Sequence, residues 1–395
     1  MFRVQPLAAA AAIALPCAAV AAPETDPFNP ALGVILDGRY ADFDRDPEAY
    51  ELPGFMLGGE AGPGESGFAL GHTELIADAN VDDLFYGRLT VAVHEHDGET
   101  EVETEEAYGE TLGLGHGLTA RFGRFFSGIG YLNDRHPHAW DFVDAPLVYR
   151  GLFGDQLRDD GVQVRWVAPT PVFLQFGAEL TQGDRFPAAG GDADAAAAFV
   201  KVGGDVGISH SWQAGLSWWG ADVAGREGGG HGHDAAHHGP AFTGDSEVAG
   251  VDFVWKWAPR GNPARRNFKL QFEWFQRDED GTLSENGSVV GSYDGTQSGW
   301  YAQAVYQFRR GWRVGLRYDR LHADNSGTNA EALAEAGLDE EGHTPERASV
   351  MVDYARSETS RLRLQYNQDR SYPETDRQVL VQYVLSLGAH GAHRF

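Results

Sequence analysis

The sequence predicts an all-β fold: a transmembrane antiparallel β-barrel of about 16 strands that follows an N-terminal signal peptide. Three observations predict this fold. Short segments with an apolar residue at every second position recur along most of the chain, the connections between them are alternately long and short, and the first residues have the pattern of a secretory signal. The 51 glycines and the 12% of aromatic residues fit a sheet with bulges and with aromatic girdles at the membrane interfaces.

Residues 1–21 are the predicted signal peptide. Arg3 precedes an apolar run that is too short to span a bilayer as a helix, and residues 19–21 (Ala-Val-Ala) form a small-x-small cleavage site. The outer-membrane barrel is then expected over residues 22–395. Cys17 is the only cysteine and lies within the signal peptide, which excludes disulfides and thiolate metal ligands in the mature chain.

Charge and hydropathy narrow the class of protein further. A net charge of -27 at pH 7 repels nucleic acid and attracts cations, so no nucleic-acid partner is expected. After the signal peptide no run approaches the ~20 apolar residues of a membrane helix. The alternative fold is a soluble secreted β-sandwich, which would turn its Trp and Phe residues toward one buried core. Amphipathic strands with charged opposite faces favour the closed barrel, because closure also removes exposed sheet edges.

The strands are placed by their alternation. Phe268, Leu270 and Phe272 share one face of a strand whose other face carries Lys269 and Gln271. An apolar face suits lipid and a polar face suits the lumen. The predicted strands are 31–41, 68–80, 84–96, 102–112, 116–126, 159–168, 171–182, 195–207, 210–221, 246–258, 265–278, 298–309, 311–322, 346–356, 359–370 and 376–388.

The connections and the last strand give the orientation and the partners. Outer-membrane barrels alternate long outside loops with short periplasmic turns, which here places the N-terminus in the periplasm of a Gram-negative bacterium. The chain ends in Phe395 after an alternating strand, the usual signal read by the outer-membrane assembly machinery. The other expected partners are outer-membrane lipid and, as in general porins, two further copies in a homotrimer. The longest outside joints are 42–67, 127–158, 222–245, 279–297 and 323–345.

The joint 127–158 does not alternate, and it is the third outside loop. In trimeric general porins this loop folds into the barrel and narrows the pore. Here it carries Tyr131, Trp140, Phe142, Tyr149 and Phe153, which are too many aromatic residues for a solvated loop. We therefore expect an inward-folded constriction loop that packs on the inner wall and presents carboxylates to the pore.

Acids on this loop would face arginines on the wall. Opposite charges across a constriction make a transverse field that selects between ions. The other interpretation is that the arginines only neutralise carboxylates in the lumen and have a structural role. The two interpretations are compatible. The predicted constriction residues are Asp134, Asp141, Asp144, Arg121, Arg165, Arg317 and Arg363.

Two stretches could bind a metal ion. His136 and His138 lie in the constriction loop near its acids, and imidazole with carboxylate suits zinc. Alternatively, they pack against Trp140 or bond to the backbone. The second stretch is the glycine-rich outer loop 222–245, which either wraps an ion or binds zinc and nickel only adventitiously. Its candidate ligands are His231, His233, His237 and His238.

The segments 130–170 and 379–395 resemble a family of proteobacterial outer-membrane barrel proteins often labelled zinc-regulated or TonB-dependent outer-membrane receptors. The resemblance implies an outer-membrane protein linked to metal supply. TonB-dependent transporters have 22 strands around a plug, whereas this chain has length for about 16 strands, so we expect a porin-like pore without a plug domain. The residues that carry the resemblance are Tyr131, Asn133, His136, His138, Trp140 and Asp141.

The predicted function is a porin-like channel for passive uptake of small solutes, cation-selective and linked to zinc supply. The alternative is a non-channel metal-binding or TonB-linked receptor barrel that its internal loop closes. Serine, histidine and acidic residues are plentiful but form no pattern typical of a nucleophile with its base, so no enzyme is predicted. No cofactor is required, and zinc is expected only as a ligand or as the transported ion.

Overall fold

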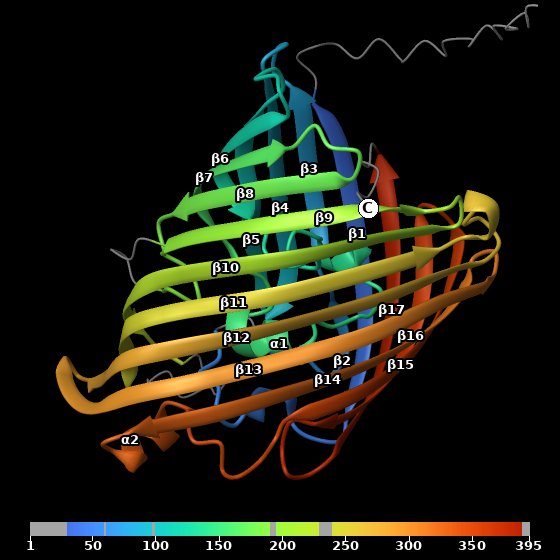
Figure 1. Cartoon of the computed structure of the whole chain (residues 1–395). Helices are drawn as coiled ribbons and strands as arrows, with labels where there is room; N and C mark the ends of the chain where they lie inside the picture. The colour runs from blue at the N-terminus through green and yellow to red at the C-terminus, as the bar shows by residue number, and fades with distance from the viewer. Residues whose placement is uncertain (1–29, 59–60, 97–98, 190–194, 229–238, 389–395) are drawn as a thin grey trace, which may run out of the picture.

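A computed structural model describes residues 30–58, 61–96, 99–189, 195–228 and 239–388 (Figure 1). They form one antiparallel sheet of seventeen strands, in which β2 and β3 are two parts of one interrupted strand, so sixteen strands span the barrel. The strands are β1 (Ala31–Phe43), β2 (Gly67–Leu70), β3 (Thr73–Asn80), β4 (Phe85–His96), β5 (Glu99–Thr111), β6 (Leu118–Phe126), β7 (Arg158–Val167), β8 (Phe173–Thr181), β9 (Ala195–Val206), β10 (His210–Arg226), β11 (Ala241–Trp257), β12 (Asn267–Glu285), β13 (Ser288–Arg309), β14 (Trp312–Gly327), β15 (Glu346–Ser357), β16 (Ser360–Arg370) and β17 (Asp376–Gly388).

The sheet closes on itself through β1. One edge of β1 pairs with β17, from Gly33 opposite Gly388 to Phe43 opposite Gln378. Its other edge pairs with β2 and β3. Every other strand pairs with its neighbours in sequence, so the barrel has a simple up-and-down order and no free edge. The prediction of a closed antiparallel barrel of about 16 strands is confirmed, and each predicted strand corresponds to an observed one.

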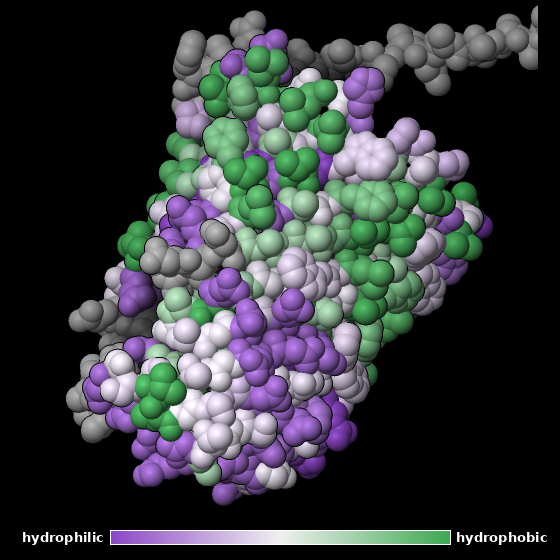
Figure 2. All heavy atoms as spheres, turned by 60° about the vertical axis from the view of Figure 1, so that its left-hand side comes forward, coloured by the Kyte–Doolittle hydropathy of each residue, from purple (hydrophilic) through white to green (hydrophobic). Residues whose placement is uncertain are grey.

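The two faces of the wall differ as the alternation predicts. On β16, Leu362 and Leu364 are each 48% exposed, while Arg363 between them is fully buried on the lumen side. Figure 2 shows green apolar side chains in a belt across the surface, and a purple hydrophilic region at the bottom of the view. An apolar belt on a closed barrel is the surface that lipid requires, so the protein is an outer-membrane barrel of a Gram-negative bacterium.

The connections also follow the predicted asymmetry, and three outside joints are shorter than predicted. The predicted joint 279–297 is almost entirely strand, and the joints 222–245 and 323–345 are shortened at their ends, because β10 to β14 extend beyond the membrane belt. The β12–β13 hairpin closes with Asn286 and Gly287, both with positive φ, as a tight two-residue hairpin turn requires. The β14–β15 connection carries the short helix α2 (Ala330–Glu335). In the described part of the chain, no helix is long and apolar enough to cross a membrane.

The segment 127–157 lies inside the barrel, as Figure 1 shows for its helix α1 (Leu147–Phe153). All seven residues of α1 are buried. The helix packs against β12, β13 and β14, where Gly299 faces it: a Cβ at Gly299 would lie 2.9 Å from Val148 Cγ2. The glycine in the wall therefore permits the close approach of the helix. The segment that was expected to form the constriction loop thus packs on the inner wall through α1.

A second outside connection, residues 44–66, also packs into the outer mouth. Its side chains Leu52, Phe55 and Leu57 are buried in the same apolar cluster as α1. The Gly54 carbonyl accepts hydrogen bonds from Gln297 Nε2 at 2.7 Å and from Asn325 Nδ2 at 2.9 Å. The two segments together pack against the wall around β12 to β14, and a cavity of about 550 Å³ lined by Asp141 and Arg313 stays open beside this wall. From the sequence, residues 42–67 were expected only to form an outside joint.

One buried carboxylate of the wall holds the start of the inner segment. Glu273 on β12 accepts hydrogen bonds from the backbone N–H groups of Tyr131 (2.8 Å) and Leu132 (3.1 Å). It also accepts from the hydroxyls of Tyr149 (2.8 Å) and Tyr301 (2.5 Å). A buried carboxylate needs such donors to offset its desolvation, and each donor would be buried without a partner if the carboxylate were lost.

We expect Glu273→Ala to release the inner segment and to lower the free energy of unfolding by about 3 kcal/mol, because four buried donors lose their acceptor. The measurements are urea unfolding in lipid and limited proteolysis across residues 128–157. Glu247→Ala is the matched control, since Glu247 lies exposed on the neighbouring strand β11. Unchanged proteolysis in Glu273→Ala would contradict the anchoring role.

Candidate functional site

The tip of the inner segment is a short 3₁₀ turn that places two histidines side by side. The turn spans Pro137–Ala139, with His136 immediately before it. It is closed by the hydrogen bonds from Ala139 N to His136 O (2.8 Å) and from Trp140 N to Pro137 O (3.1 Å). The two imidazole rings stack at 5.7 Å between centroids with 23° between their planes. Both rings therefore point the same way, toward the wall formed by β3, β4 and β5.

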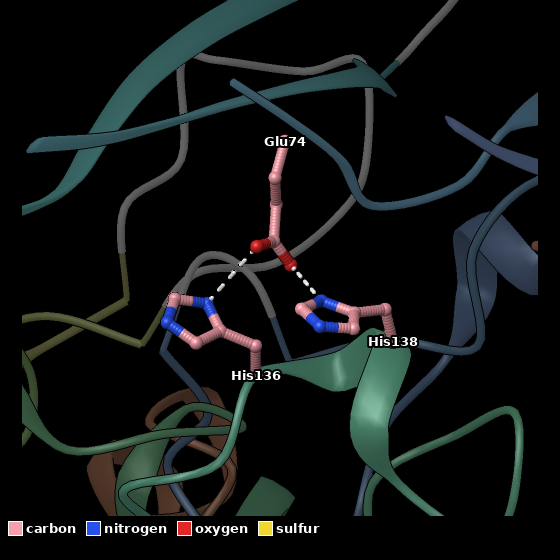
Figure 3. Close-up of side chains that lie close together, drawn as sticks. All are labelled: Glu74, His136 and His138. Atoms are coloured by element: carbon pink, nitrogen blue, oxygen red, sulfur yellow. Dashed lines mark hydrogen bonds and ion pairs between the residues drawn. The ribbon is translucent and has the colours of Figure 1, made fainter. Parts of the chain in front are cut away.

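Glu74 on β3 receives both rings, as Figure 3 shows. Its Oε1 lies 2.6 Å from His138 Nδ1, and its Oε2 lies 3.3 Å from His136 Nδ1. The Glu74 side chain is fully buried. The ligand atoms of these three residues all lie within 4.8 Å of one another, which is close enough to surround one metal ion.

β5 adds two consecutive glutamates to the same cluster. In the β4–β5 ladder Thr90 pairs with Glu106 and Val91 pairs with Thr104, so Glu105 is the extra residue of a β-bulge. A regular strand would turn one of two consecutive side chains toward lipid, whereas the bulge turns both Glu105 and Glu106 into the lumen, where both are buried. Glu106 Oε2 lies 2.9 Å from His136 Nε2.

Several ligand atoms at the cluster have no hydrogen bond. Among the residues that the structure describes, Glu74 Oε2, Glu105 Oε2 and His136 Nδ1 are buried without a hydrogen-bond partner. Buried polar atoms are normally paired, so this convergence requires an explanation. Burial alone would lower the pKa of the His136 imidazole, but the carboxylates of Glu74 and Glu106 outweigh burial and hold that pKa well above its usual value.

The cluster has a cavity on each side. A cavity of about 400 Å³ reaches the outer connection 44–66 and is lined by His72, Glu105 and Pro137 on its inner side. A cavity of about 180 Å³ near the short periplasmic turns is lined by Glu106, His136 and His138. The histidine–glutamate cluster therefore lies between an outer and a periplasmic cavity.

Three of the predicted constriction residues line the periplasmic cavity. They are Asp134, Arg121 and Arg165. Both arginines reach Glu110, at 2.8 Å from Arg121 Nη2 and 2.6 Å from Arg165 Nη2. Structurally these groups lie on the periplasmic side of the histidine–glutamate cluster rather than opposite one another across it.

The other four predicted constriction residues lie in direct contacts between the inner segment and the wall. Asp144 Oδ1 is 2.6 Å from Arg317 Nη2, and Asp141 Oδ1 is 2.8 Å from Arg313 Nη1. Arg363 is fully buried and donates to the Trp140 carbonyl. Acids of the inner segment and arginines of the wall thus lie in direct contact, and Asp141 with Arg313 also lines a cavity of about 550 Å³.

Sequence reasoning found the two histidines but missed their carboxylate partners. Glu74, Glu105, Glu106 and His72 were not among the predicted residues. Two signals were present: His72 and Glu74 are two positions apart, and Glu105-Glu106 breaks the alternation of its strand. The outer-loop candidates lie outside the described residues, as do the signal peptide and Phe395. Those candidates are His231, His233, His237 and His238.

The chain was compared with known proteins. No family model matches it. An uncharacterized protein of Aquifex aeolicus is 31% identical over 401 residues, which cover 93% of this chain and 80% of that protein. The chain therefore belongs to the same family as the Aquifex aeolicus protein.

Solved structures show the same fold at low sequence identity. OprB of Pseudomonas putida has a TM-score of 0.55 at 13% identity, over 91% of this chain and 94% of that chain. The outer membrane channel DcaP of Acinetobacter baumannii has a TM-score of 0.54 at 15% identity, over 91% and 96%. The fold is thus that of porin-like outer-membrane barrels, and the expected porin-like class is confirmed at this level. The TonB-dependent receptor label has no support in these comparisons.

The raised pKa of His136 predicts a pH dependence of stability when metal is chelated. The folded state holds this proton more tightly than the unfolded chain, whose histidine pKa is about 6.5. The added stability is therefore complete below that value and is lost as pH rises through the raised pKa. Urea unfolding midpoints with chelator should fall with rising pH, and His136→Gln should reduce this slope. His322→Ala, on an exposed residue of β14, should keep the slope; an unchanged slope in His136→Gln would contradict the assignment.

Proposed function

We propose that the protein is a porin-like channel of the outer membrane that passes small cations and binds zinc at its constriction. The observation that carries the proposal is the convergence of Glu74, His136 and His138 between the outer and periplasmic cavities. The inner segment packs against the wall between β12 and β16. A solute that crosses the barrel along the two cavities therefore meets this cluster.

The spacing of the cluster supports a zinc ion. Ligand atoms around a tetrahedral zinc with bonds of about 2.1 Å lie ~3.4 Å apart. His136 Nδ1 lies 3.3 Å from Glu74 Oε2 and 3.5 Å from Glu105 Oε2. These are the buried atoms without hydrogen bonds, and a cation would satisfy all of them. Imidazole nitrogen and carboxylate oxygen are ordinary zinc ligands, and no thiolate is needed.

The charges along the two cavities support selectivity for cations at the outer mouth. Six carboxylates and three guanidinium groups line the outer cavity, whereas five cationic groups and two carboxylates line the periplasmic one. Acidic walls raise the local concentration of cations. The outer carboxylates belong to Glu65, Glu95, Glu101, Glu105, Asp144 and Asp155, and the periplasmic cations to Arg88, Arg121, Arg135, Arg165 and Lys201.

The second candidate function is a metal-binding barrel that does not conduct. The observation that favours it is the packing of the inner segment, whose helix α1 is buried against the wall. Both candidate functions include the metal site, and they differ only in whether a solute passes through the barrel. A homotrimer and recognition of the last strand by the assembly machinery stay predictions for either candidate.

Zinc titration tests the metal site. We expect the His136→Ala/His138→Ala variant to bind zinc more weakly by roughly tenfold or more, because two of the converging ligands are lost. The measurement is calorimetry on the folded barrel in detergent. His322→Ala is the control, and deletion of residues 228–239 separates any contribution of the outer histidines. Equal affinity in wild type and the double variant would remove this cluster from metal binding.

Planar-bilayer recording tests the channel. Wild-type protein should show conductance steps with a cation-selective reversal potential in a potassium chloride gradient, and zinc should reduce the current because it occupies the constriction. Glu273→Ala, which releases the inner segment, should give larger steps and serves as the control for insertion. If Glu273→Ala gave conductance steps and wild type gave none, the channel would be overturned and the closed metal-binding barrel would be the remaining candidate.

A further inference from the structure

We propose a second cation site next to the first, formed by His72 and Glu105 with Glu74 shared between the two sites. It would receive a divalent transition-metal ion from the outer cavity and pass it to Glu74, His136 and His138. This inference rests on the proposed function and adds a second binding site to the same path. The ligand atoms of His72, Glu74 and Glu105 lie within 4.8 Å of one another.

The position of His72 follows from a break in the strand. Leu70 on β2 and Leu75 on β3 are both exposed to lipid, at 46% and 49%, although residues five positions apart on a regular strand would face opposite sides. The chain therefore changes phase at Gly71 and His72, between β2 and β3. After this change His72 and Glu74 both face the lumen, where His72 Nε2 lies 2.7 Å from Glu105 Oε1.

Two irregularities of the wall thus meet at one place. The break before β3 and the bulge at Glu105 each interrupt the backbone ladder, and each turns an additional ligand inward. Bulges that re-aim side chains are typical of functional sites. Glu105 Oε2 is also buried without a hydrogen bond among the described residues, and it lies between the His72 side and the His136 side of the cluster.

The carboxylates connect the second site to the first. Glu105 turns Oε1 toward His72 and Oε2 toward His136 Nδ1, at 3.5 Å. Glu74 likewise turns Oε1 toward His138 and Oε2 toward His136. An ion could exchange one ligand at a time between the two sites without returning to water. Neighbouring sites also favour release, because two cations held close together repel each other.

A further histidine leads from the second site to the outer mouth. The His94 ring stacks on His72 at 6.4 Å between centroids with 3° between the planes. His94 Nδ1 is buried and forms no hydrogen bond within the described residues, and His94 Nε2 lies 3.4 Å from Glu101 Oε2. Glu101 is exposed in the outer cavity. Ligand groups therefore continue from the cavity mouth to the second site.

The far end of the path carries positive charge. Arg88 Nη2 lies 3.3 Å from His136 Nε2, and Arg88 Nε lies 2.8 Å from Glu106 Oε2. An ion that leaves His136 toward the periplasmic cavity would meet this guanidinium group. The guanidinium charge would shorten its stay there. The outer side attracts cations and the periplasmic side weakens their binding, as a multi-site path requires.

The test is a titration of the full-length folded barrel with zinc by calorimetry and with cobalt(II) by its visible absorption. Wild type should bind two ions, and His72→Gln/His94→Ala should bind one with the affinity of the tighter site unchanged. Glutamine at position 72 keeps a donor for Glu105 but is a poor metal ligand, so the variant should fold. In zinc-loaded proteoliposomes the His72→Gln/His94→Ala variant should show a zinc flux about tenfold lower than that of wild type.

The outcomes separate this inference from the proposed function. Saturation of wild type at one ion, or two ions bound by His72→Gln/His94→Ala, would overturn the second site while the first stands. No zinc binding by wild type, or binding unaffected by His136→Ala/His138→Ala, would overturn the proposed function. Unchanged flux in His72→Gln/His94→Ala with one ion lost would overturn the transfer step.

Discussion

Buried carboxylates between the inner segment and the wall are the interaction on which the rest of the structure depends. Sixteen-stranded barrels enclose more space than their wall side chains fill. Here the segment 127–157 of the chain occupies part of that space, which removes its peptide N–H groups and charges from water. Glu273 and Asp319 of the wall offset that cost by accepting hydrogen bonds from backbone N–H groups of the segment, and Asp144 of the segment accepts one from Arg317 of the wall. Without them the segment would have no fixed position.

The position of the segment decides where a site can form. Because α1 packs against β12 to β14, the turn at Pro137 reaches the opposite wall, where β3 to β5 are irregular. There the break before β3 and the bulge at Glu105 interrupt the regular backbone pairing and turn carboxylate side chains toward the lumen. The polar cluster is thus the meeting point of a rigid loop tip with a locally distorted sheet. The two cavities are the space that remains on either side of it.

Much of the fold could be predicted because alternation is a local property. Leu362 and Leu364 on one face and Arg363 on the other identify a membrane strand without knowledge of its neighbours. The extensions of β10 to β14 were missed because strands outside the lipid belt need no apolar face. Half of the site could also be predicted, since His136 and His138 lie two positions apart in the sequence. Glu74 and Glu105 were missed because they lie 62 and 31 residues from His136 along the chain.

The sequence by itself determined the barrel, its approximate size and the segment that breaks the alternation of the strands. These follow from periodicity, connection length and composition, which act over a few residues at a time. Only the tertiary structure decided that the acids Asp141 and Asp144 lie in buried contacts with the wall, and that the histidines meet three glutamates. Those pairings depend on strand register, and a single bulged residue at Glu105 changes which side chains face the lumen.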